Sequence, residues 1–588
     1  MEAIWRVHGL RADFDALGQE FGIDPVVARV IRNRGIETSE EFDTYLNGGL
    51  DIQHAPNLLA DMDKACNIMI EKINQGKTIR IISDYDVDGV MSNYILLVGL
   101  QNLGANVSYE IPDRMLDGYG INERIIRDAH RDQIDTLITC DNGIGAFDAV
   151  KLAKSLGMTI IVTDHHEPPV MEDQQGNMVK TFVEADAVVN PKRPDCQYPF
   201  KEICGATVAY KFMKRMYELL DKTWEEDLFV EMLGIATVCD VMPLKGENRA
   251  FVKRALQKMK NTDNKGLKAL LQVNGLAGKK ITSYTFGFVV GPCINASGRL
   301  DSAKKGLKLL LADNEADALT MAQELKEINE ERKAMTEQGK LEAVKLVEDF
   351  YMDDTVLVVH MPQLHESLAG IVAGRLKEQF HKPTLVCTTT EEGFLKGSAR
   401  SIEAYNMHEK LSEHKELFRG MGGHPMAAGF SLETENLDVL RERLNKTHGL
   451  KPEELVPVVM IDVAMPFSYI TPELVRQLDK LEPYGTGNPK PVFAQADLKV
   501  KKARFMGNEN QYIKIWFMDN EGRTIEAVDF DAKTFIDSIK MWFSDEECDK
   551  MLKGLPNDIL LDVIYYPDIN EYMGRTSIQL KPSRYKKA

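Results

Sequence analysis

The stretch Thr78-Ile79-Arg80-Ile81-Ile82-Ser83-Asp84-Tyr85-Asp86-Val87-Asp88-Gly89 is an apolar, β-branched run that ends abruptly in three alternating aspartates. Its β-branched residues predict a buried strand over 78–83. Alternate residues of an extended chain point the same way, so the three carboxylates face one side. Gly89 permits a tight turn into a following helix. The stretch therefore predicts a strand that brings carboxylates to the start of a helix.

Three further apolar runs end in the same manner: Thr136–Cys140 at Asp141, Met158–Thr163 at Asp164-His165-His166, and Leu233–Cys239 at Asp240. We predict that all four runs are strands of one parallel sheet, because open α/β sheets bind ligands where the carboxyl ends of their strands meet. Many hard oxygen donors beside one or two imidazoles suit Mg²⁺ or Mn²⁺, held as a pair. The sequence thus predicts a site for two divalent cations.

Each of these motifs has an ordinary explanation when it is taken alone. The segment 84–89 also suits a solvated acidic turn or part of an EF-hand, although an EF-hand needs a helix before the loop rather than a strand. Single histidines such as His165 or His166 are more often structural than ligating. Four such segments within one domain favour a common site.

Composition indicates an ordinary soluble protein of several domains. At 588 residues the chain is too long for one core, and its apolar content of 44% and charged content of 28% are typical of globular proteins. We expect no membrane span or signal peptide, and we interpret the eight scattered cysteines as reduced thiols in the cytoplasm. The net charge of −18 argues against a protein that coats duplex DNA, but it does not exclude nucleic acid as a substrate.

The pattern of strands and helices predicts an α/β multidomain protein. We expect a helical lead-in, a parallel-sheet domain, a connecting region with a long helix over 312–347, a smaller α/β domain and a C-terminal β-barrel. The expected boundaries are 1–55, 56–260, 261–348, 349–452 and 456–588.

Within the smaller domain and the barrel, individual elements can be predicted. We expect strands at Thr355–His360, Pro383–Cys387, Tyr512–Phe517 and Ile559–Tyr566, a helix at Gly370–Phe380, and a shaped glycine loop at Gly420–His424. From about residue 456 the pattern reads as all-β.

In their order along the chain, the motifs resemble those of the DHH phosphoesterase family. The resemblance rests on Asp84–Gly89, Ile111–Arg114 with Gly118–Gly120, Cys140–Gly143 and Asp164–His166. Later segments resemble the members of that family that degrade single-stranded DNA, with their DHHA1 domain and OB-fold: Asn295–Arg299, the long helix, Gly397–Ser401, Gly422–Gly429, Leu481–Pro489 and Asn570–Arg575. The resemblance covers the chain from about residue 55 onward.

The resemblance implies a two-metal centre that hydrolyses phosphodiester bonds. Its metal ligands would be Asp86, Asp88, Asp141, His165 and Asp240, with Asp84 and His166 in or just behind this set, and these seven residues would form the catalytic group. Asp141 would bridge the two Mn²⁺ or Mg²⁺ ions. Such a pair activates water and stabilises the attacking and leaving oxygens, so no protein nucleophile is required.

The resemblance also implies a set of phosphate-binding residues: Arg114, Arg299, Arg375, Ser398, Arg400 and His424. A guanidinium group suits phosphate because it offers planar, paired donors, although any single arginine is more often an ordinary surface residue. Two positions depart from the family. Cys293 stands where arginine is usual, which removes a phosphate contact and leaves Arg299 more alone, and Ser367 stands where glycine is usual.

We therefore predict a metal-dependent 5′→3′ exonuclease of single-stranded DNA that acts in DNA repair and recombination. Tyr512, Lys514 and Trp516 share one strand face and could stack bases of the strand or pack in an interface. We expect a monomer without membrane association whose partners are single-stranded DNA and a single-strand-binding protein or helicase. The alternatives are a DHH phosphodiesterase of short oligonucleotides or cyclic dinucleotides, and an inactive scaffold for replication proteins.

Overall fold

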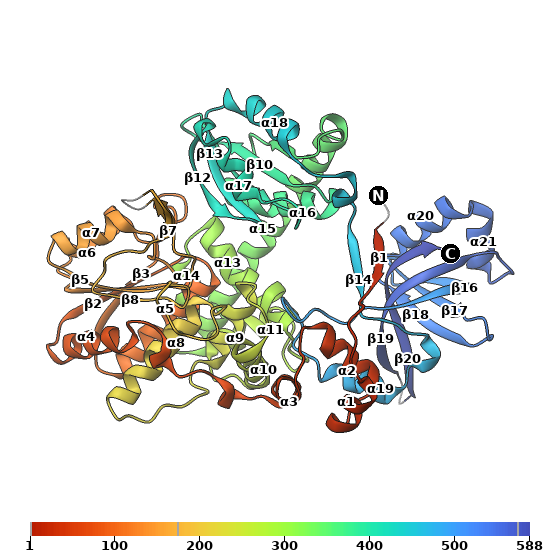
Figure 1. Cartoon of the computed structure of the whole chain (residues 1–588), viewed down its shortest axis with the longest axis horizontal. Helices are drawn as coiled ribbons and strands as arrows, with labels where there is room; N and C mark the ends of the chain where they lie inside the picture. Colours follow the sequence, from red (N-terminus) through yellow and green to blue (C-terminus); the bar gives the residue numbers. More distant parts are fainter. Residues whose placement is uncertain (1–2, 173–175, 573–574) are drawn as a thin grey trace. The chain divides into compact units, whose positions relative to one another are not determined.

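A computed structural model describes residues 3–172, 176–572 and 575–588 of the chain. The chain divides into two compact units, one formed by Gly49–Pro457 and the other by Ala3–Gly48 together with Val458–Ala588 (Figure 1). Residues 573 and 574 of the segment Asn570–Arg575, which contributes to the family resemblance, lie outside the described residues.

The first unit begins with the predicted parallel sheet. Its strands run in the order β3-β2-β4-β5-β8, and every neighbouring pair is parallel. The strands are β2 (Thr78–Ser83), β3 (Asn106–Glu110), β4 (Thr136–Cys140), β5 (Thr159–Thr163) and β8 (Ala187–Val189). A separate hairpin is formed by β6 (Val170–Glu172) and β7 (Met178–Lys180). The fold class predicted for this region is confirmed.

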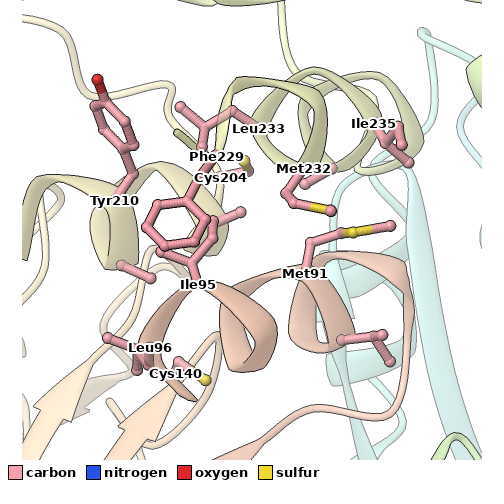
Figure 2. Close-up of a cluster of buried hydrophobic side chains, with 14 of the residues drawn as sticks. Met91, Ile95, Leu96, Cys140, Cys204, Tyr210, Phe229, Met232, Leu233 and Ile235 are labelled. Carbon is pink, nitrogen blue, oxygen red and sulfur yellow. The ribbon is translucent and has the colours of Figure 1, made fainter. Parts of the chain in front are cut away.

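Helices cover both faces of this sheet. They are α4 (Met62–Asn74), α5 (Val87–Asn102), α6 (Glu123–Arg131), α7 (Phe147–Ser155) and α8 (Gly205–Leu219). Three more helices, α9 (Val230–Cys239), α10 (Gly246–Met259) and α11 (Lys265–Val273), pack mainly on other helices. Because successive strand residues point to opposite faces, Ile81 packs with α4, α5 and α8, whereas Ile82 packs with α6 and α7. Figure 2 shows the core between the helices, where Met91 and Ile95 of α5 face Phe229 and Met232.

One predicted strand of the sheet is wrong. Leu233–Cys239 belongs to helix α9, which is buried almost all round and packs against α5, α8 and α10. A short apolar run that is buried on every side has no amphipathic period, so its pattern does not distinguish a strand from a helix. Asp240 consequently follows the C-terminal end of a helix instead of the end of a strand.

A run of helices leads from the first sheet to the second. It consists of α12 (Ser283–Thr285), the π-helical turn η3 (Phe286–Val290), α13 (Gly291–Leu300), α14 (Lys304–Leu310) and α15 (Glu315–Phe350). The predicted long helix is α15, with 36 residues. Its first half buries Ala322 and Leu325 in the first core, and its second half buries Ala343 and Val347 against the second.

The second sheet of this unit has the order β12-β13-β11-β10-β9. Its elements are β9 (Leu357–His360), η4 (Glu366–Leu368), α16 (Ala369–Phe380), β10 (Thr384–Thr389), β11 (Leu395–Arg400), α17 (Met407–Ser412), β12 (Phe418–His424), β13 (Ala427–Leu432) and α18 (Asn436–Thr447). The glycine-rich segment 420–424 is part of strand β12, so its prediction as a loop is wrong. Glycine is needed there because a Cβ on Gly423 would lie 2.3 Å from the carbonyl oxygen of Ala427 on the paired strand.

The second unit contains a closed barrel, because β16 pairs with both β17 and β19. Its elements are β14 (Val458–Ile461), β15 (Val463–Ala464), α19 (Pro472–Asp479), β16 (Phe493–Met506), β17 (Tyr512–Met518), β18 (Thr524–Asp529), α20 (Ala532–Trp542), α21 (Asp545–Lys553), β19 (Leu560–Tyr572) and β20 (Arg575–Lys587). The predicted barrel is confirmed, but the all-β pattern is wrong, since three helices interrupt it. Their amphipathic faces pack on the barrel core through residues such as Leu474, Phe535 and Met551.

The N-terminal segment packs with the barrel unit. It forms β1 (Ile4–Val7), α1 (Phe14–Phe21), α2 (Pro25–Asn33) and α3 (Ser39–Asn47). β1 pairs in parallel with β14, and Phe42 of α3 lies in the barrel core. A buried ion pair between Arg34 and Asp462, with an Nη1–Oδ1 distance of 2.7 Å, joins the two segments. Through these contacts, the predicted lead-in packs with the barrel, which is distant in sequence. It forms one unit with the barrel and not with the parallel-sheet domain that follows it in the chain.

Candidate active site

The predicted metal ligands lie at one edge of the parallel sheet. Asp84 and Asp86 connect β2 to α5, Asp88 lies in the first turn of α5, Asp141 follows β4, and His165 follows β5. Because β2, β4 and β5 are neighbours and parallel, their carboxyl ends open on the same side. Asp240 reaches this edge from the C-terminal end of α9.

The seven predicted catalytic residues form three overlapping groups. Each residue of a group offers one candidate ligand atom, and these atoms lie within 4.8 Å of one another. The groups are Asp84 with Asp86 and Asp141, Asp88 with His165 and Asp240, and Asp141 with His165 and His166. Asp141 shares one group with Asp84 and Asp86 and another with His165, which in turn shares a group with Asp88 and Asp240. Such adjoining groups suit a pair of cations.

Unpaired buried oxygen and nitrogen atoms show that the site fits cations. Within the described residues, Asp84 Oδ1, Asp141 Oδ1, Asp240 Oδ2 and His165 Nε2 are buried and have no hydrogen-bond partner. His165 Nε2 lies 3.1 Å from Asp141 Oδ1, 3.5 Å from Asp240 Oδ2 and 3.6 Å from Asp88 Oδ2. Leaving such groups unpaired costs about 1–3 kcal/mol each, and divalent cations between them would remove that cost.

The electrostatics of the cluster are those of carboxylates held together without counter-charge. Burial raises the pKa of Asp141 well above its ordinary value, and the neighbouring carboxylates of Asp88 and Asp86 raise it further. The same two causes raise the pKa of Asp84 and Asp240, and they raise the pKa of Asp88 to about 6. Each of these carboxyls therefore holds a proton more tightly than it would in an unfolded chain.

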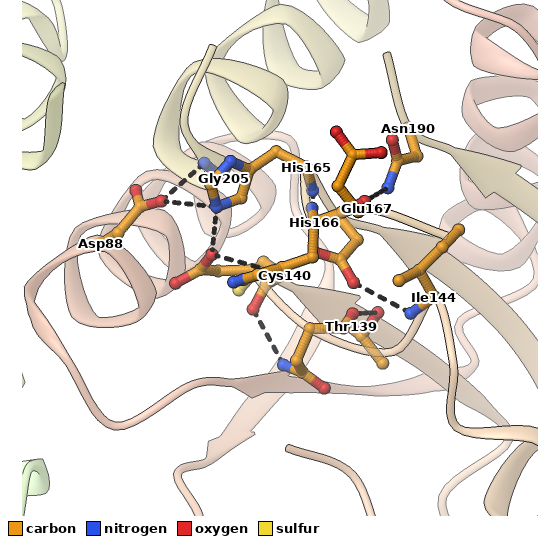
Figure 3. A network of polar contacts seen from close by, with 12 residues as sticks. Asp88, Thr139, Cys140, Ile144, His165, His166, Glu167, Asn190 and Gly205 are labelled. Carbon is orange, nitrogen blue, oxygen red and sulfur yellow. Dashed lines mark hydrogen bonds and ion pairs between the residues drawn. The ribbon is translucent and has the colours of Figure 1, made fainter. Parts of the chain in front are cut away.

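The N-terminal end of α8 holds Asp88 in place. The backbone N–H group of Gly205 donates to its carboxylate at 2.6 Å (Figure 3), and that of Ala206 donates at 2.8 Å. These donors have no partner within the helix, and the helix dipole favours negative charge there. Gly205 is required, since a Cβ would lie 2.6 Å from the Cβ of Asp141.

The backbone at Asp141 is in the left-handed region, with φ of 62°. Only glycine, asparagine and aspartate adopt this conformation readily. The side chain of Asn142 secures the loop, because its amide donates to the carbonyls of Ile82 and Cys140 and its oxygen accepts from the N–H of Ile121. The left-handed turn directs the Asp141 carboxylate toward His165.

Asp164 is a site residue that sequence reasoning missed. Its carboxylate accepts hydrogen bonds from the backbone N–H groups of Ile144, His165 and His166, and lies 2.8 Å from His166 Nδ1. Burial and the charge of His166 act in opposite directions, and the pKa of Asp164 falls to about 2. Its place directly after a strand and before two histidines is the signal that could have identified it.

The two histidines have different charge states. Burial, aided by the nearby charge of His166, lowers the pKa of His165 to about 3, so this imidazole is neutral. Burial also lowers the pKa of His166, but the Asp164 carboxylate outweighs it and raises that pKa to about 9. The hydroxyl of Tyr119, another residue absent from the predicted set, lies 3.1 Å from His166 Nδ1 and donates to the carbonyl of Asp141 at 3.2 Å.

Five of the six predicted phosphate-binding residues gather in one region. Burial and the charge of Arg114 together lower the pKa of Arg299 to about 10. Burial and the charge of Arg114 likewise lower the pKa of Arg400. Ser398 precedes Arg400 on β11, and burial and the charge of Arg400 lower the pKa of His424. Mutually repelling cations so close together indicate a site for an anion.

Arg375 is connected to this group only through Arg332 of α15, whose pKa is lowered by burial and by the charge of Arg375. It is exposed on α16 and its Nη1 lies 3.2 Å from a carboxylate oxygen of Glu378, one turn along the same helix. Surface pairs of this kind contribute little. The structure adds Arg332 of α15 to the predicted phosphate-binding residues, because its charge contributes to the lowered pKa of Arg299.

The two departures from the family pattern have local explanations. Cys293 is buried and lies 3.8 Å and 3.6 Å from the side-chain amides of Asn274 and Asn329. Asn329 accepts a hydrogen bond from Arg332, so a cation is still present near Arg299. Ser367 lies 2.8 Å from His365 Nδ1 through its hydroxyl, and its carbonyl accepts from Arg299 at 2.8 Å.

Tyr512, Lys514 and Trp516 lie on one face of strand β17, as predicted. Lys502 Nζ lies 4.4 Å and Lys514 Nζ 5.5 Å from the ring centre of Trp516. Glu526 accepts hydrogen bonds from both Lys514 and Trp516. Tyr512 stacks edge-to-face with Phe530, 5.5 Å away. This face combines aromatic surface with cations, as single-strand-binding sites do.

Addition of Mn²⁺ is expected to stabilise the folded protein more at about pH 8 than at about pH 5. Because the pKa values of Asp84, Asp88, Asp141 and Asp240 are raised in the folded state, these carboxyls destabilise the metal-free fold as pH rises through those values. Mn²⁺ requires the deprotonated carboxylates and displaces their protons, so its binding strengthens with pH. At about 100 times its Kd, the ion adds about 2.7 kcal/mol to the free energy of unfolding.

Thermal melting with and without Mn²⁺ across this pH range measures the effect. The variant Asp148→Asn, which changes an aspartate in the first turn of α7, should keep the full shift. An equal Mn²⁺-induced shift at both pH values would contradict the carboxylate cluster as the site.

Comparison with known proteins places the chain among DNA exonucleases. Three family models match: the DHH family N-terminal domain over 78–237, the DHHA1 domain over 353–448 and the RecJ OB domain over 461–583. The chain is 34% identical over 88% of its length to the single-stranded-DNA-specific exonuclease RecJ of Bacillus subtilis (strain 168) and spans 64% of that protein. It is 30% identical to RecJ of Escherichia coli (strain K12), with 95% of both chains covered.

Solved structures agree with these relatives. RecJ from Thermus thermophilus in complex with Mn²⁺ superposes with a TM-score of 0.81 at 26% identity, covering 100% of this chain and 80% of that one. The same protein in complex with Mg²⁺ superposes with a TM-score of 0.76 at 25% identity, covering 100% of this chain and 78% of that one.

Proposed function

This chain belongs to the RecJ family of single-stranded-DNA-specific exonucleases, and we propose that it removes nucleotides from the 5′ end at the cluster centred on Asp141. It is a hydrolase that uses Mn²⁺ or Mg²⁺. The observation that carries the proposal is the set of buried, unpaired oxygen and nitrogen atoms that surround His165 Nε2.

The chain's own residues divide the work of hydrolysis. Asp86, Asp88, Asp141, His165 and Asp240 hold the two cations. When bound, the cations activate water and neutralise the charge that develops on the phosphate oxygens. No side chain in the cluster is needed as a nucleophile.

His166 supplies a positive charge beside the scissile phosphate. Its pKa of about 9 keeps the imidazole protonated at neutral pH, and Asp164 fixes the orientation of the ring. A protonated imidazole can donate a hydrogen bond to a phosphate oxygen or a proton to the leaving oxygen. Asp84 lies beside it and contributes to its raised pKa.

The positively charged side chains of Arg114 and Arg400, together with their neighbours, bind the terminal 5′-phosphate. Arg114 lies over the ring of Tyr85, 4.8 Å from its centre, next to Asp84 and Asp86. Arg299, Ser398 and His424 complete this anion site. A terminal phosphate carries more charge than an internal one, so a site built from repelling cations prefers the end of a strand. The direction of degradation follows from this preference.

Strand selectivity rests on size and stacking. We infer that residues following the first sheet and residues on the second sheet of the same unit enclose the substrate closely enough to admit one strand and exclude a duplex. The face containing Tyr512, Lys514 and Trp516 binds incoming bases. Arg375 contributes to phosphate binding more weakly, because Glu378 already pairs with it.

The compartment and the partners of the protein can also be inferred. We infer a monomer that acts in the cytoplasm in DNA repair and recombination, on strands supplied by a helicase or held by a single-strand-binding protein. The eight cysteines are free thiols, which supports a reducing compartment. In the described part of the chain, no helix has the length and apolarity needed to cross a membrane.

A single experiment tests the function. A long 5′-phosphorylated single strand, labelled at each end in turn, should release its 5′ label first as a mononucleotide in the presence of Mn²⁺. The corresponding duplex should be resistant. Faster hydrolysis of a dinucleotide than of the long strand would favour the small-substrate phosphodiesterase, against which the barrel domain counts. No hydrolysis of either substrate would favour the scaffold.

The variant Arg400→Ala tests the 5′-phosphate site in the same assay. It should reduce the preference for a 5′-phosphate over a 5′-hydroxyl about tenfold or more, because a charge-assisted hydrogen bond contributes about 1.5–3 kcal/mol. Arg127→Ala, which alters an exposed arginine paired with Glu123 on α6, is the matched control. An unchanged preference in the Arg400 variant would exclude it from the site.

A further inference from the structure

Tyr284 and Phe288 form an exposed aromatic pair that the proposed mechanism does not use. Their ring centres lie 4.8 Å apart, and the ring planes are 16° from parallel. The two residues are 65% and 62% exposed. Two large rings held in solvent in a stacked arrangement are unusual, because burying them would stabilise the fold. Such a pair indicates a surface that another molecule covers.

The pair lies beside the candidate active site. Phe288 belongs to the π-helical turn η3, which packs on α9, the helix that ends at Asp240. The approach is close, since a Cβ on Gly291 would lie 2.3 Å from Cys239 Sγ, and this thiol donates to the carbonyl of Phe286. π-helical turns often occur at functional sites.

The segment of chain just before the pair lines a basic groove. The groove has a volume of ≈ 640 Å³, and its lining includes Lys260, Lys268, Lys279 and Ile281 but no carboxylate. In a chain with a net charge of −18, this composition is distinctive. Lys268 pairs with Glu315, whereas Lys260 and Lys279 form no ion pair with any residue in the described ranges. Helix α11, which lines the groove, contacts η3.

Helix α13 gives the approximate distance between this surface and the 5′-phosphate site. Arg299 lies near Arg114 and Asp86 at one end of α13, and Phe288 lies just before its other end. The roughly eleven residues between them span about 16 Å at about 1.5 Å per residue. This length corresponds to about five nucleotides at the roughly 3.4 Å spacing of a B-form strand, and to fewer in a stretched strand.

We propose that Tyr284 and Phe288 stack on bases of the substrate strand on the 3′ side of the cleaved bond, while Lys260 and Lys279 bind its phosphates. Aromatic faces and lysines without paired carboxylates suit single-stranded nucleic acid irrespective of sequence. The inference rests on the proposed function, because it assumes that the 5′ end lies at Arg114. The surface then holds the remainder of the strand after each cleavage.

The length dependence of binding tests the inference. Affinities of 5′-phosphorylated oligo(dT) for the full chain are measured by fluorescence anisotropy in EDTA, so that no hydrolysis occurs. The double variant Tyr284→Ala/Phe288→Ala should bind strands of about ten nucleotides or more about tenfold more weakly. Trimers, which are too short to reach the pair, should bind as they do to the unaltered protein. Phe350→Ala, a change at an aromatic residue that is 67% exposed, should alter neither affinity.

Two further measurements separate stacking and charge from a structural role. Abasic nucleotides at about the fifth to seventh positions should weaken binding to the unaltered protein but not to the double variant. Lys260→Ala/Lys279→Ala should reduce the slope of log affinity against log salt concentration by about 1.4.

Equal binding of long strands by the double variant and the unaltered protein would overturn the inference, as would equal weakening for trimers. Failure of the proposed function has a different signature, because the unaltered protein would then not release the 5′ label in the Mn²⁺ assay at all.

Discussion

Replacing Asp141 with asparagine is expected to reduce kcat on single-stranded DNA at least about a thousandfold while leaving the protein folded. Asp141 belongs to two of the three candidate ligand groups, one with Asp84 and Asp86 and one with His165 and His166, so its loss removes a ligand from both of these groups. Asparagine tolerates the left-handed backbone at this position, where φ is 62°. It also removes a buried, repelled carboxylate, so the free energy of unfolding in EDTA should be unchanged or higher.

The comparison with alanine separates chemistry from backbone strain. Asp141→Ala should lose activity to the same extent, and it should lower the free energy of unfolding by about 1 kcal/mol relative to the asparagine variant. Initial rates with Mn²⁺ and denaturant unfolding in EDTA measure the two effects. Asp148→Asn serves as the control. Retention of more than about 1% of the activity by Asp141→Asn would refute the central position assigned to this residue.

Replacing Asp164 with asparagine is expected to lower activity about a hundredfold at about pH 8 and less at about pH 6. Asp164 raises the pKa of His166 to about 9, so the imidazole is protonated throughout this range in the unaltered protein. Without that carboxylate, the largest contribution opposing burial is lost and the pKa of His166 falls, so the ring loses its proton at a lower pH. The ratio of the activity of the unaltered protein to that of the variant should therefore increase with pH.

A pH–rate profile and an NMR titration of His166 measure this effect. Asp186→Asn is the matched control, because Asp186 also accepts a backbone hydrogen bond, from Ile160 at 2.8 Å, but lies outside the cluster. A merely structural role for Asp164 would lower the activity equally at every pH. That result would contradict the assignment of His166 as a protonated group in catalysis.

The strands of the parallel sheet could be predicted closely from local pattern. Thr78–Ser83 and Thr136–Cys140 have the bounds that the structure gives to β2 and β4, because β-branched residues and an abrupt polar end are local signals. The run before Asp240 could not be assigned in the same way. Its residues are buried on all sides in α9, so its helical geometry is decided by packing against α5, α8 and α10.

Phosphate-binding residues were harder to predict than the carboxylate cluster. Arg375 and Arg400 have the same chemistry, yet Arg375 is exposed beside Glu378, whereas Arg400 is near enough to Arg114 for the two charges to interact. Arg332 was missed because a single arginine on a long helix has no motif. Only the placement of α15 against α13 reveals it.

By itself, the sequence determined the α/β class, the long helix, the barrel and the candidate cation ligands, since each depends on composition and on residues close together in the chain. The tertiary structure decided which side chains meet and in which charge state. It brings Asp84, Asp141 and Asp240 together from separate elements, divides the imidazoles into a neutral His165 and a charged His166, and packs the N-terminal helices with the barrel. Burial and the distances between charges set these properties, and neither can be read from a linear pattern.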